Sequence, residues 1–277
     1  MNIFRISAAA AAVLAALAAA ANAHASSVTH ASHRAYYEIG IGRVDAGASI
    51  VDATGRMIAE WRQACEGWTT NQKLVVSMAP GEGDPIDSEV SLTSFENSDG
   101  TEYTFDSETI VDGETVERVR GRAERPAPGQ PGKARYDEPR GITLDLPADT
   151  VFPFEHTIAV LEAAERGEKR SFNHYYDGSQ PEISPMAANA LILGKPRAPG
   201  EGGIASLGEL AQRKWWPVRL AMFDGQKKDG GEEQPEFEMT QILQDNGVVR
   251  KFEFDYGEFS LVASLIRVEP LEAPRCN

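Results

Sequence analysis

The clearest hairpin signal in this 277-residue chain is FEMTQILQDNGVVRKFEFDYG (237–257). Apolar and polar side chains alternate along both of its halves, which is the pattern of a strand with one buried and one exposed face. The dipeptide Asn246-Gly247 stands between the halves. This pair is preferred in the two-residue type I′ turn. The stretch therefore predicts an antiparallel β-hairpin.

Alternating segments recur on both sides of this hairpin. Residues 98–100 (Ser-Asp-Gly) predict a second hairpin, because Asp-Gly between alternating runs is a strong hairpin signal. Within residues 47–64 we expect two strands joined by a tight turn at 53–55 (Ala-Thr-Gly). The segment 197–210 matches no clear element. In all, about a dozen or more strands are expected, which indicates an all-β fold.

One helix is expected, within PADTVFPFEHTIAVLEAAERGEKR (147–170). Asp149 and Thr150 are candidates for its N-cap, and Pro153 suits the first turn. Gly167 can take the left-handed conformation that ends helices. A large antiparallel sheet must hide its edges, so we expect it to curl into a barrel or to wrap around this helix. A single helix would leave an apolar groove beside it.

The N-terminus has the features of a secretory signal peptide. Residues 1–25 contain one basic residue, Arg5, followed by an Ala-rich apolar run and two alternative cleavage sites, after Ala23 or after Ala25. An uncleaved membrane anchor is the alternative, although the run is shorter than the ~20 residues of a membrane span. We therefore expect export, to a bacterial periplasm.

The remainder of the chain divides into two parts. Residues 26–33 (SSVTHASH) are expected to form a disordered leader, and residues 34–277 a single domain, since no linker interrupts the alternating pattern. The formal net charge of −15 disfavours nucleic acid and anionic membranes as partners. No later segment is apolar enough to span a membrane.

The chain has two cysteines, Cys65 and Cys276. In an oxidising compartment two cysteines indicate one disulfide, and within one chain only the pair Cys65–Cys276 can form. An intermolecular disulfide and a redox-active pair are the alternatives, but redox pairs usually have the C-x-x-C spacing, which is absent. The bond would fasten the tail to a segment near the start.

A search for catalytic motifs is mostly negative. The sequence has no G-x-S-x-G elbow, no H-E-x-x-H pair and no Gly-rich phosphate loop. His30 and His33 form only a weak metal-ligand pair, so no metal or cofactor is expected. His156 could act as a general base, but a structural histidine between helix and sheet is the favoured interpretation.

The tryptophans give a modest indication of binding. Aromatic side chains dominate both cores and recognition grooves. Because neighbours in a strand face opposite sides, one of Trp215 and Trp216 is expected to line a groove or an exposed surface. The candidate groove or interaction residues are Trp61, Trp68, His156, Trp215 and Trp216.

Several segments resemble one known family. They are DATGRMIAEWRQACEGW (52–68), LPADTVFPFEHTIAVLEAAERGE (146–168), PEFEMTQILQDNGVVRKFEFDYGEFSL (235–261) and the cysteine near the end of the chain. Together with the signal peptide they resemble the cell envelope integrity protein EipB family of alphaproteobacteria. None of these segments is a catalytic motif.

The resemblance implies a fold and a role. It implies a long antiparallel sheet wound as a β-spiral or broken barrel around a helix, similar to periplasmic lipoprotein-carrier folds, with the disulfide at Cys65 and Cys276. It also implies a periplasmic role in envelope integrity under stress, and a genetic link to periplasmic tetratricopeptide-repeat proteins.

Three functions follow as hypotheses. The first is a non-enzymatic envelope protein whose groove binds a peptide, an acyl chain or a partner protein. The second is a purely structural domain that docks a partner through a sheet edge without a ligand. The third is an envelope hydrolase that uses His156 together with a carboxylate.

Overall fold

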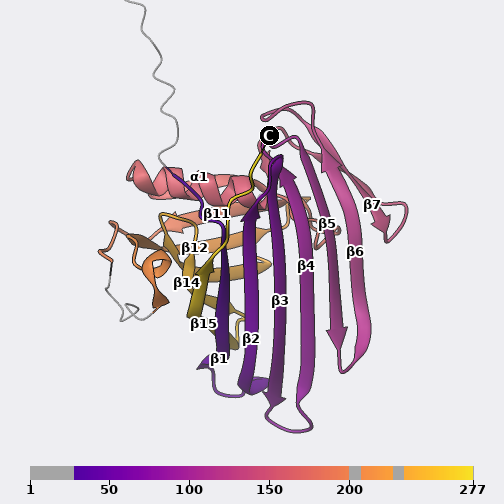
Figure 1. Ribbon diagram of the computed structural model, residues 1–277. Coiled ribbons are helices and arrows are strands. Elements are labelled where there is room, and N and C mark those ends of the chain that lie inside the picture. Colours follow the sequence, from indigo (N-terminus) through magenta and orange to yellow (C-terminus); the bar gives the residue numbers. More distant parts are fainter. Residues whose placement is uncertain (1–27, 200–206, 227–233, 277) are drawn as a thin grey trace, which may run out of the picture.

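The computed structural model describes residues 28–199, 207–226 and 234–276. The predicted signal peptide, part of the segment 197–210 and part of the acidic loop after residue 226 lie outside the described residues. The described part contains one α-helix, one short 3-10 helix and a single sheet of 15 strands (Figure 1). The expected fold class, all-β with one helix in a barrel-like sheet, is confirmed.

The strands are long at the start of the chain and shorter toward its middle. They are β1 (His33–Val44), β2 (Ile50–Gln63), β3 (Gly67–Pro80), β4 (Ile86–Asn97), β5 (Glu102–Val111), β6 (Glu114–Glu124), β7 (Gly132–Glu138), β8 (Thr143–Leu146), β9 (Thr150–Val151), β10 (Arg170–Tyr175), β11 (Met186–Ile192), β12 (Trp215–Phe223), β13 (Phe237–Gln244), β14 (Val249–Asp255) and β15 (Phe259–Pro270). The helices are α1 (Pro153–Glu165) and η2 (Glu209–Ala211).

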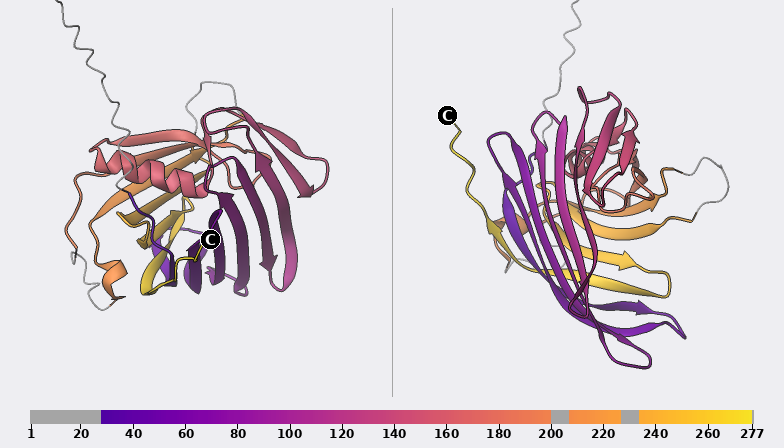
Figure 2. Two further views of the ribbon diagram at one scale, coloured as in Figure 1. Left: turned by 45° about the horizontal axis from the view of Figure 1, so that its top comes forward. Right: turned by 90° about the vertical axis from the view of Figure 1, so that its right-hand side faces the viewer.

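The first and last strands of the chain lie side by side in the middle of the sheet. Its strand order runs from β8 through β1 and then from β15 back to β9, so that the first and last strands are neighbours. The pairing of β1 with β15 is antiparallel and places Ala35 opposite Val268. The two edge strands, β8 and β9, are consecutive in the chain, so the chain passes directly from one edge of the sheet to the other. This winding curls the sheet (Figure 2).

Alternation sorts the side chains onto two faces. We call the face that carries Tyr37 and Met57, which lie opposite each other on β1 and β2, the inner face. Both side chains are buried in the core. Helix α1 packs against the later strands (Figure 2). There Val160 and Leu161 belong to one buried cluster with Trp216 on the inner face. The outer face carries mostly polar and charged residues.

The hairpin expected at residues 237–257 is confirmed as β13 and β14, but its turn differs from the expected type. Gly247 has φ of +82°, whereas Asn246 is not left-handed, because Asp112 is the one non-glycine with positive φ among the described residues. The N–H of Gly247 donates to Gln244 O (3.0 Å), and the N–H of Gln244 donates to Val248 O (3.0 Å). This is a three-residue loop with a left-handed glycine, not a type I′ turn.

The tight turn expected at residues 53–55 is wrong. Residues 50–63 form the single strand β2, which runs straight through this position. A side chain on Gly55 would collide with the backbone of Val75 and Val76 on β3. This glycine therefore marks a close approach of two strands, which sequence alone does not distinguish from a turn.

The helix cap also differs from the expectation. Asp149 and Thr150 do not cap α1, whose N-cap is Phe152, without a side-chain hydrogen bond of its own. The backbone N–H groups of Phe154 and Glu155 donate instead to the carboxylate of Glu96 on β4 (2.8 and 3.0 Å). Burial outweighs these hydrogen bonds and raises the pKa of Glu96 to about 8.

The end of the helix agrees with the sequence pattern. Gly167 follows it with φ of +75°, and its N–H donates to Ala164 O (3.0 Å). The N–H of Glu168 donates to Ala163 O (2.9 Å), so both carbonyl groups are satisfied.

Candidate functional site

A cleft enters the inside of the curled sheet. Its deep part, which we call the inner cavity, has a volume of about 240 Å³. Its outer part, which we call the mouth, has a volume of about 920 Å³. The two share Tyr175, Phe237 and Met239 in their linings, so they adjoin each other.

The inner cavity is apolar and aromatic. Phe252 and Phe254 lie two residues apart on β14, face inward together and stack at 5.6 Å between ring centroids. The ring of Tyr37 on β1 meets Phe252 at 5.4 Å. The histidines His30 and His33 are the titratable imidazoles of this lining, and no Asp, Glu, Lys or Arg belongs to it. The lining residues are His30, His33, Tyr37, Met57, Ala59, Trp61, Gln72, Thr157, Tyr175, Phe237, Met239, Gln241, Leu243, Gly247, Val249, Phe252 and Phe254.

Residues 28–33 close one end of the inner cavity. The ring of His30 lies 5.2 Å from Trp61, 5.1 Å from Trp68 and 5.5 Å from Phe154, measured between centroids. Burial lowers the pKa of His30 to about 3, so this imidazole is neutral. The disordered leader expected at 26–33 is therefore wrong for residues 28–33: His30 and His33 are buried, and β1 begins at His33. The aromatic partners lie far away in sequence, so local polarity gave no sign of them.

The C-terminal tail crosses the same end of the molecule. The N–H of Leu271 donates to Ser32 O (2.9 Å). The tail then reaches the turn between β2 and β3, where Cys276 is bonded to Cys65 with 5.5 Å between their Cα atoms (Figure 1). The two cysteines are thus paired within one chain, and the bond ties the tail beside the segment that closes the cavity.

His156 does not have the surroundings of a general base. It is buried in α1, and its Nδ1 lies 3.0 Å from Oδ1 of Asn173 on β10. Its Nε2 is buried and has no hydrogen-bond partner among the described residues. Burial lowers the pKa of His156. An amide cannot stabilise an imidazolium as a carboxylate does, so this arrangement favours a structural role.

The four tryptophans separate into two groups. Trp61 lines the inner cavity, and Trp68 stacks on Phe154 at 4.5 Å behind it. Trp215 and Trp216 lie outside the cleft, with exposed fractions of 5% and 1%. The expectation that one of this pair lines a groove or an exposed surface is wrong. The guanidinium groups of Arg197 and Arg250 each lie 4.9 Å from the Trp215 ring and cover it.

Sequence reasoning missed the residues that line most of the cleft. Met239, Phe252 and Phe254 belong to the stretch 237–257, and their inward direction follows from its alternation. The alternation therefore predicted the direction of these side chains. It did not predict that a cavity would remain between them and the strands opposite.

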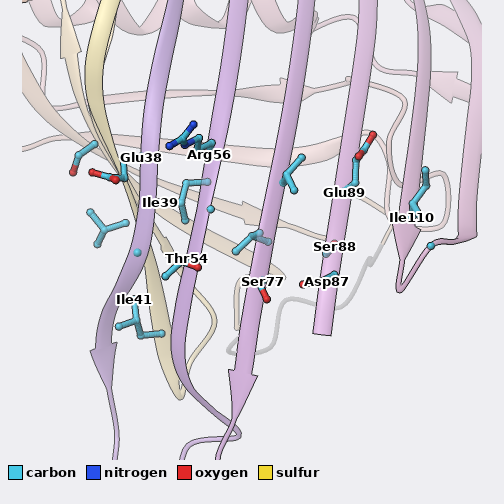
Figure 3. A pocket seen from close by; sticks show the side chains of 17 residues that line it. Glu38, Ile39, Ile41, Thr54, Arg56, Ser77, Asp87, Ser88, Glu89 and Ile110 are labelled. Atoms are coloured by element: carbon cyan, nitrogen blue, oxygen red, sulfur yellow. The ribbon is translucent and has the colours of Figure 1, made fainter. Parts of the chain in front are cut away.

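A second depression lies on the other side of the sheet. It is a shallow hollow of about 1080 Å³ that crosses β1 to β5 (Figure 3). The charged side chains of Glu38, Arg56 and Glu89 surround it. Most of its lining side chains stand on the outer face, and Gly40 contributes none. It is larger than the inner cavity but more open, so it offers an apolar ligand less protection from water.

The described residues show no metal centre and no membrane helix. No group of three or more His, Cys, Asp or Glu side chains in residues 28–199, 207–226 and 234–276 could hold a metal ion. Over the same residues, no helix is long and apolar enough to cross a membrane.

Comparison with known proteins gives a consistent result. The model of the EipB-like family matches residues 24–272. The cell envelope integrity protein EipB of Brucella abortus (strain 2308) is 33% identical over 248 residues, which cover 88% of this chain and 86% of that protein. The crystal structure of a beta-barrel-like protein of a domain of unknown function, also from Brucella abortus, superimposes with a TM-score of 0.78 at 30% identity, over 88% of this chain and 100% of that one.

Proposed function

Because this chain belongs to the EipB-like family, we propose that it supports the integrity of the cell envelope as a non-enzymatic protein that holds an apolar chain in its cleft. A curated relative is named as a cell envelope integrity protein. The protein acts after export by the signal peptide at residues 1–25, in the periplasm, and contributes to stress resistance there. Cell fractionation with N-terminal sequencing tests this location: an uncleaved, cytoplasmic chain would contradict it.

The observation that carries the proposal is the lining of the inner cavity. Most of its side chains are aromatic, methionine or aliphatic, its polar side chains are uncharged, and the mouth adjoins it. Methionine side chains adapt to irregular apolar surfaces, which suits a flexible acyl chain or an apolar peptide segment. Small-molecule sites are concave and mostly apolar in this way.

The hydrolase hypothesis receives less support. His156 is buried, its hydrogen-bonded partner is an amide, and it is absent from the linings of the inner cavity and the mouth. A His156→Gln variant should therefore keep envelope function as long as it folds. Loss of function in a variant of unchanged thermal stability would favour the hydrolase instead.

The experiment is a pair of variants that add the same side chain on opposite faces of β3. Gln72 lines the inner cavity and is half-buried, whereas the neighbouring Asn71 is exposed on the outer face. Gln72→Trp should fill the cavity and abolish the binding of dodecyl maltoside, measured by isothermal titration calorimetry below its micelle concentration. Asn71→Trp is the matched control and should bind like the wild type. Equal binding by both variants, or none by the wild type, would contradict the proposal.

A second candidate function rests on the outer face. Val75, Ile58 and Ile266 are apolar but 45%, 40% and 48% exposed there. Such side chains suit the docking of an envelope protein, for which the family resemblance suggests a periplasmic tetratricopeptide-repeat protein. Val75→Glu would then remove function while leaving the calorimetric binding in the cleft unchanged.

A further inference from the structure

We propose that the open edge of β10 binds an extended segment of a partner protein, which adds to the sheet as a further strand beside α1. The surface lies outside the cleft, so this inference does not depend on the proposed function. It rests on unpaired backbone groups along β10, on a groove between these groups and the helix, and on the side chains that border the groove.

The backbone of β10 is paired along one side and largely unpaired along the other. It pairs with β11 over its whole length, from Arg170 to Tyr175. On the other side, β9 pairs only with His174 and Tyr175. No strand of the described sheet lies beside residues 170–173 on that side. This stretch is therefore an open sheet edge, with which another backbone can pair.

The hydrogen-bond pattern shows which backbone groups point toward the open side. The N–H of Ile192 donates to the O of Lys169, directly opposite (2.9 Å). In an antiparallel pair every second residue is hydrogen-bonded to the same neighbour. Arg170 and Phe172 lie between these positions, so their N–H and C=O groups point away from β11. No backbone hydrogen bond within the described residues satisfies these groups.

A groove of about 480 Å³ runs along this edge. One of its walls is formed by residues 170–173, and the other by a face of α1 that includes Ala159 and Ala163. These two alanines lie one helical turn apart, and their small side chains leave room beside the strand. Successive side chains of an added strand alternate between its faces, so every second one would point toward α1. Apolar residues suit those positions. Extended peptides bind other proteins in this way, by adding to an exposed sheet edge.

Another open edge in the described sheet is protected by charge. Residues 114–119 of β6 extend beyond the pairing with β7. Arg118 stands there among three carboxylates, those of Asp106 (3.7 Å), Glu108 (3.8 Å) and Glu138 (3.8 Å). Charged side chains on an edge hinder pairing with a further strand. The open edge of β10 instead carries Phe172, which is apolar and 57% exposed. This edge is therefore the one that favours an added strand.

The charges around the groove leave one cation without an anionic neighbour. The four carboxylates of the lining each contact an arginine or histidine side chain. The contacts are Glu155 with Arg125 (2.6 Å), Glu162 with Arg166 (3.8 Å), Glu168 with Arg166 (2.6 Å) and Asp149 with His174 (2.8 Å). Arg170 also lines the groove, is exposed and makes no such contact within the described residues. A carboxylate of the bound segment can pair with it.

The test begins with peptides that the protein itself selects. Random heptapeptides displayed on phage are enriched on the purified protein, synthesised with a fluorescent label and titrated by fluorescence anisotropy. The selected peptides should carry apolar residues at alternate positions and an acidic residue. If no peptide is enriched, the inference is wrong.

Two methylated forms of one selected peptide test the pairing of the backbones. One form carries N-methyl groups on the odd-numbered residues, and the other on the even-numbered residues. Only alternate N–H groups of an added strand face its neighbour. One form should therefore lose binding and the other should keep it. Equal binding by the two forms would overturn the inference.

A pair of variants tests the same point on the protein. Phe172→Ala and Phe172→Pro both remove the aromatic ring, but only proline also removes the N–H that points to the open side. This N–H has no partner in the folded protein, so the two variants should melt at similar temperatures. Phe172→Pro should bind the peptide about tenfold more weakly than Phe172→Ala, as expected for one lost hydrogen bond. Equal affinities would contradict the proposed pairing.

Two further measurements test the charge and the occupant. Arg170→Gln should weaken the binding of an acidic peptide by about twofold to fivefold, the effect of an exposed ion pair. In analytical ultracentrifugation the wild type should be a monomer. A dimer that Phe172→Pro dissociates would assign the edge to a second copy of this chain and overturn the inference. None of these outcomes affects binding in the cleft, so the proposed function is tested separately.

Discussion

The disulfide between Cys65 and Cys276 should account for a large part of the stability of this fold. Its loop has a sequence separation of 211 residues. For a loop of this length the chain-entropy relation gives an upper figure of about 5 kcal/mol at 25 °C. The stabilisation arises mainly because the bond restricts the unfolded chain.

The C-terminal tail of the folded protein reduces the stabilisation that is expected from the disulfide. Beyond Pro270 the tail has no regular structure, and one backbone hydrogen bond, from Leu271 to Ser32, holds its start. Without the bond, residues 272–276 gain freedom in the folded protein as well, which offsets part of the entropy that the unfolded chain gains. We therefore expect a loss of about 2–4 kcal/mol, the usual range for removal of a disulfide.

The perturbation is Cys65→Ser/Cys276→Ser, which avoids a free thiol. Each kcal/mol lowers the melting temperature of a chain of this size by about 2–4 °C. The variant should thus melt about 4–16 °C below the wild type in differential scanning calorimetry. Reductant should lower the melting temperature of the wild type toward that of the variant and leave the variant unchanged. A shift under about 1 °C would refute the reasoning, because the β1–β15 pairing alone would then hold the ends together.

Three further predictions concern buried polar groups and a tight turn. Burial raises the pKa of Glu96 to about 8, so the stability that its protonation contributes is complete below its ordinary pKa and is lost as the pH rises through 8. In Glu96→Gln, the free energy of unfolding from urea denaturation should decline less between pH 5 and 8 than in the wild type. An unchanged slope would contradict the assignment. Burial lowers the pKa of His30 to about 3, so the stability that its neutral form contributes is present above pH 6.5 and is lost as the pH falls toward 3. The free energy of unfolding of His30→Gln should therefore fall less in acid over this range. A decline equal to that of the wild type would exclude His30 as the cause. Gly247→Ala should lower the free energy of unfolding in urea by about 2–4 kcal/mol, because the left-handed φ of this position is combined with a collision with the His30 ring. Gly47 has a similar φ but open space around it, so Gly47→Ala should cost only about 1 kcal/mol. Equal losses would rule out the collision.

The sequence predicted those features that depend on neighbours in the chain. The alternation in residues 237–257 identified two strands and, through its period of two, the side on which Met239 and Phe252 lie. Gly167 marked the end of the helix, because the left-handed conformation there is a local requirement. The family resemblance supplied the curled sheet around a helix.

The features that sequence missed depend on distant contacts. The cap of α1 comes from Glu96, which is 58 residues away from Phe154. Gly55 resembles a turn residue in the local pattern, because that pattern does not reveal the close approach of β3. Trp215 is buried because Arg197 and Arg250 cover it on a face that alternation alone marks as exposed.

The pairing of β1 with β15 also limits how this protein can be made. Tyr36 and its hydrogen-bonded partner Glu269 are 233 residues apart, so a chain that is synthesised from its N-terminus carries β1 with one edge unpaired until β15 has emerged. An open edge of this kind invites aggregation, and a nascent chain would benefit from a chaperone over that interval. Because Cys276 follows β15, the bond to Cys65 can form only after the final strand exists. Every molecule that carries this disulfide has therefore already synthesised β15, the strand that pairs with β1.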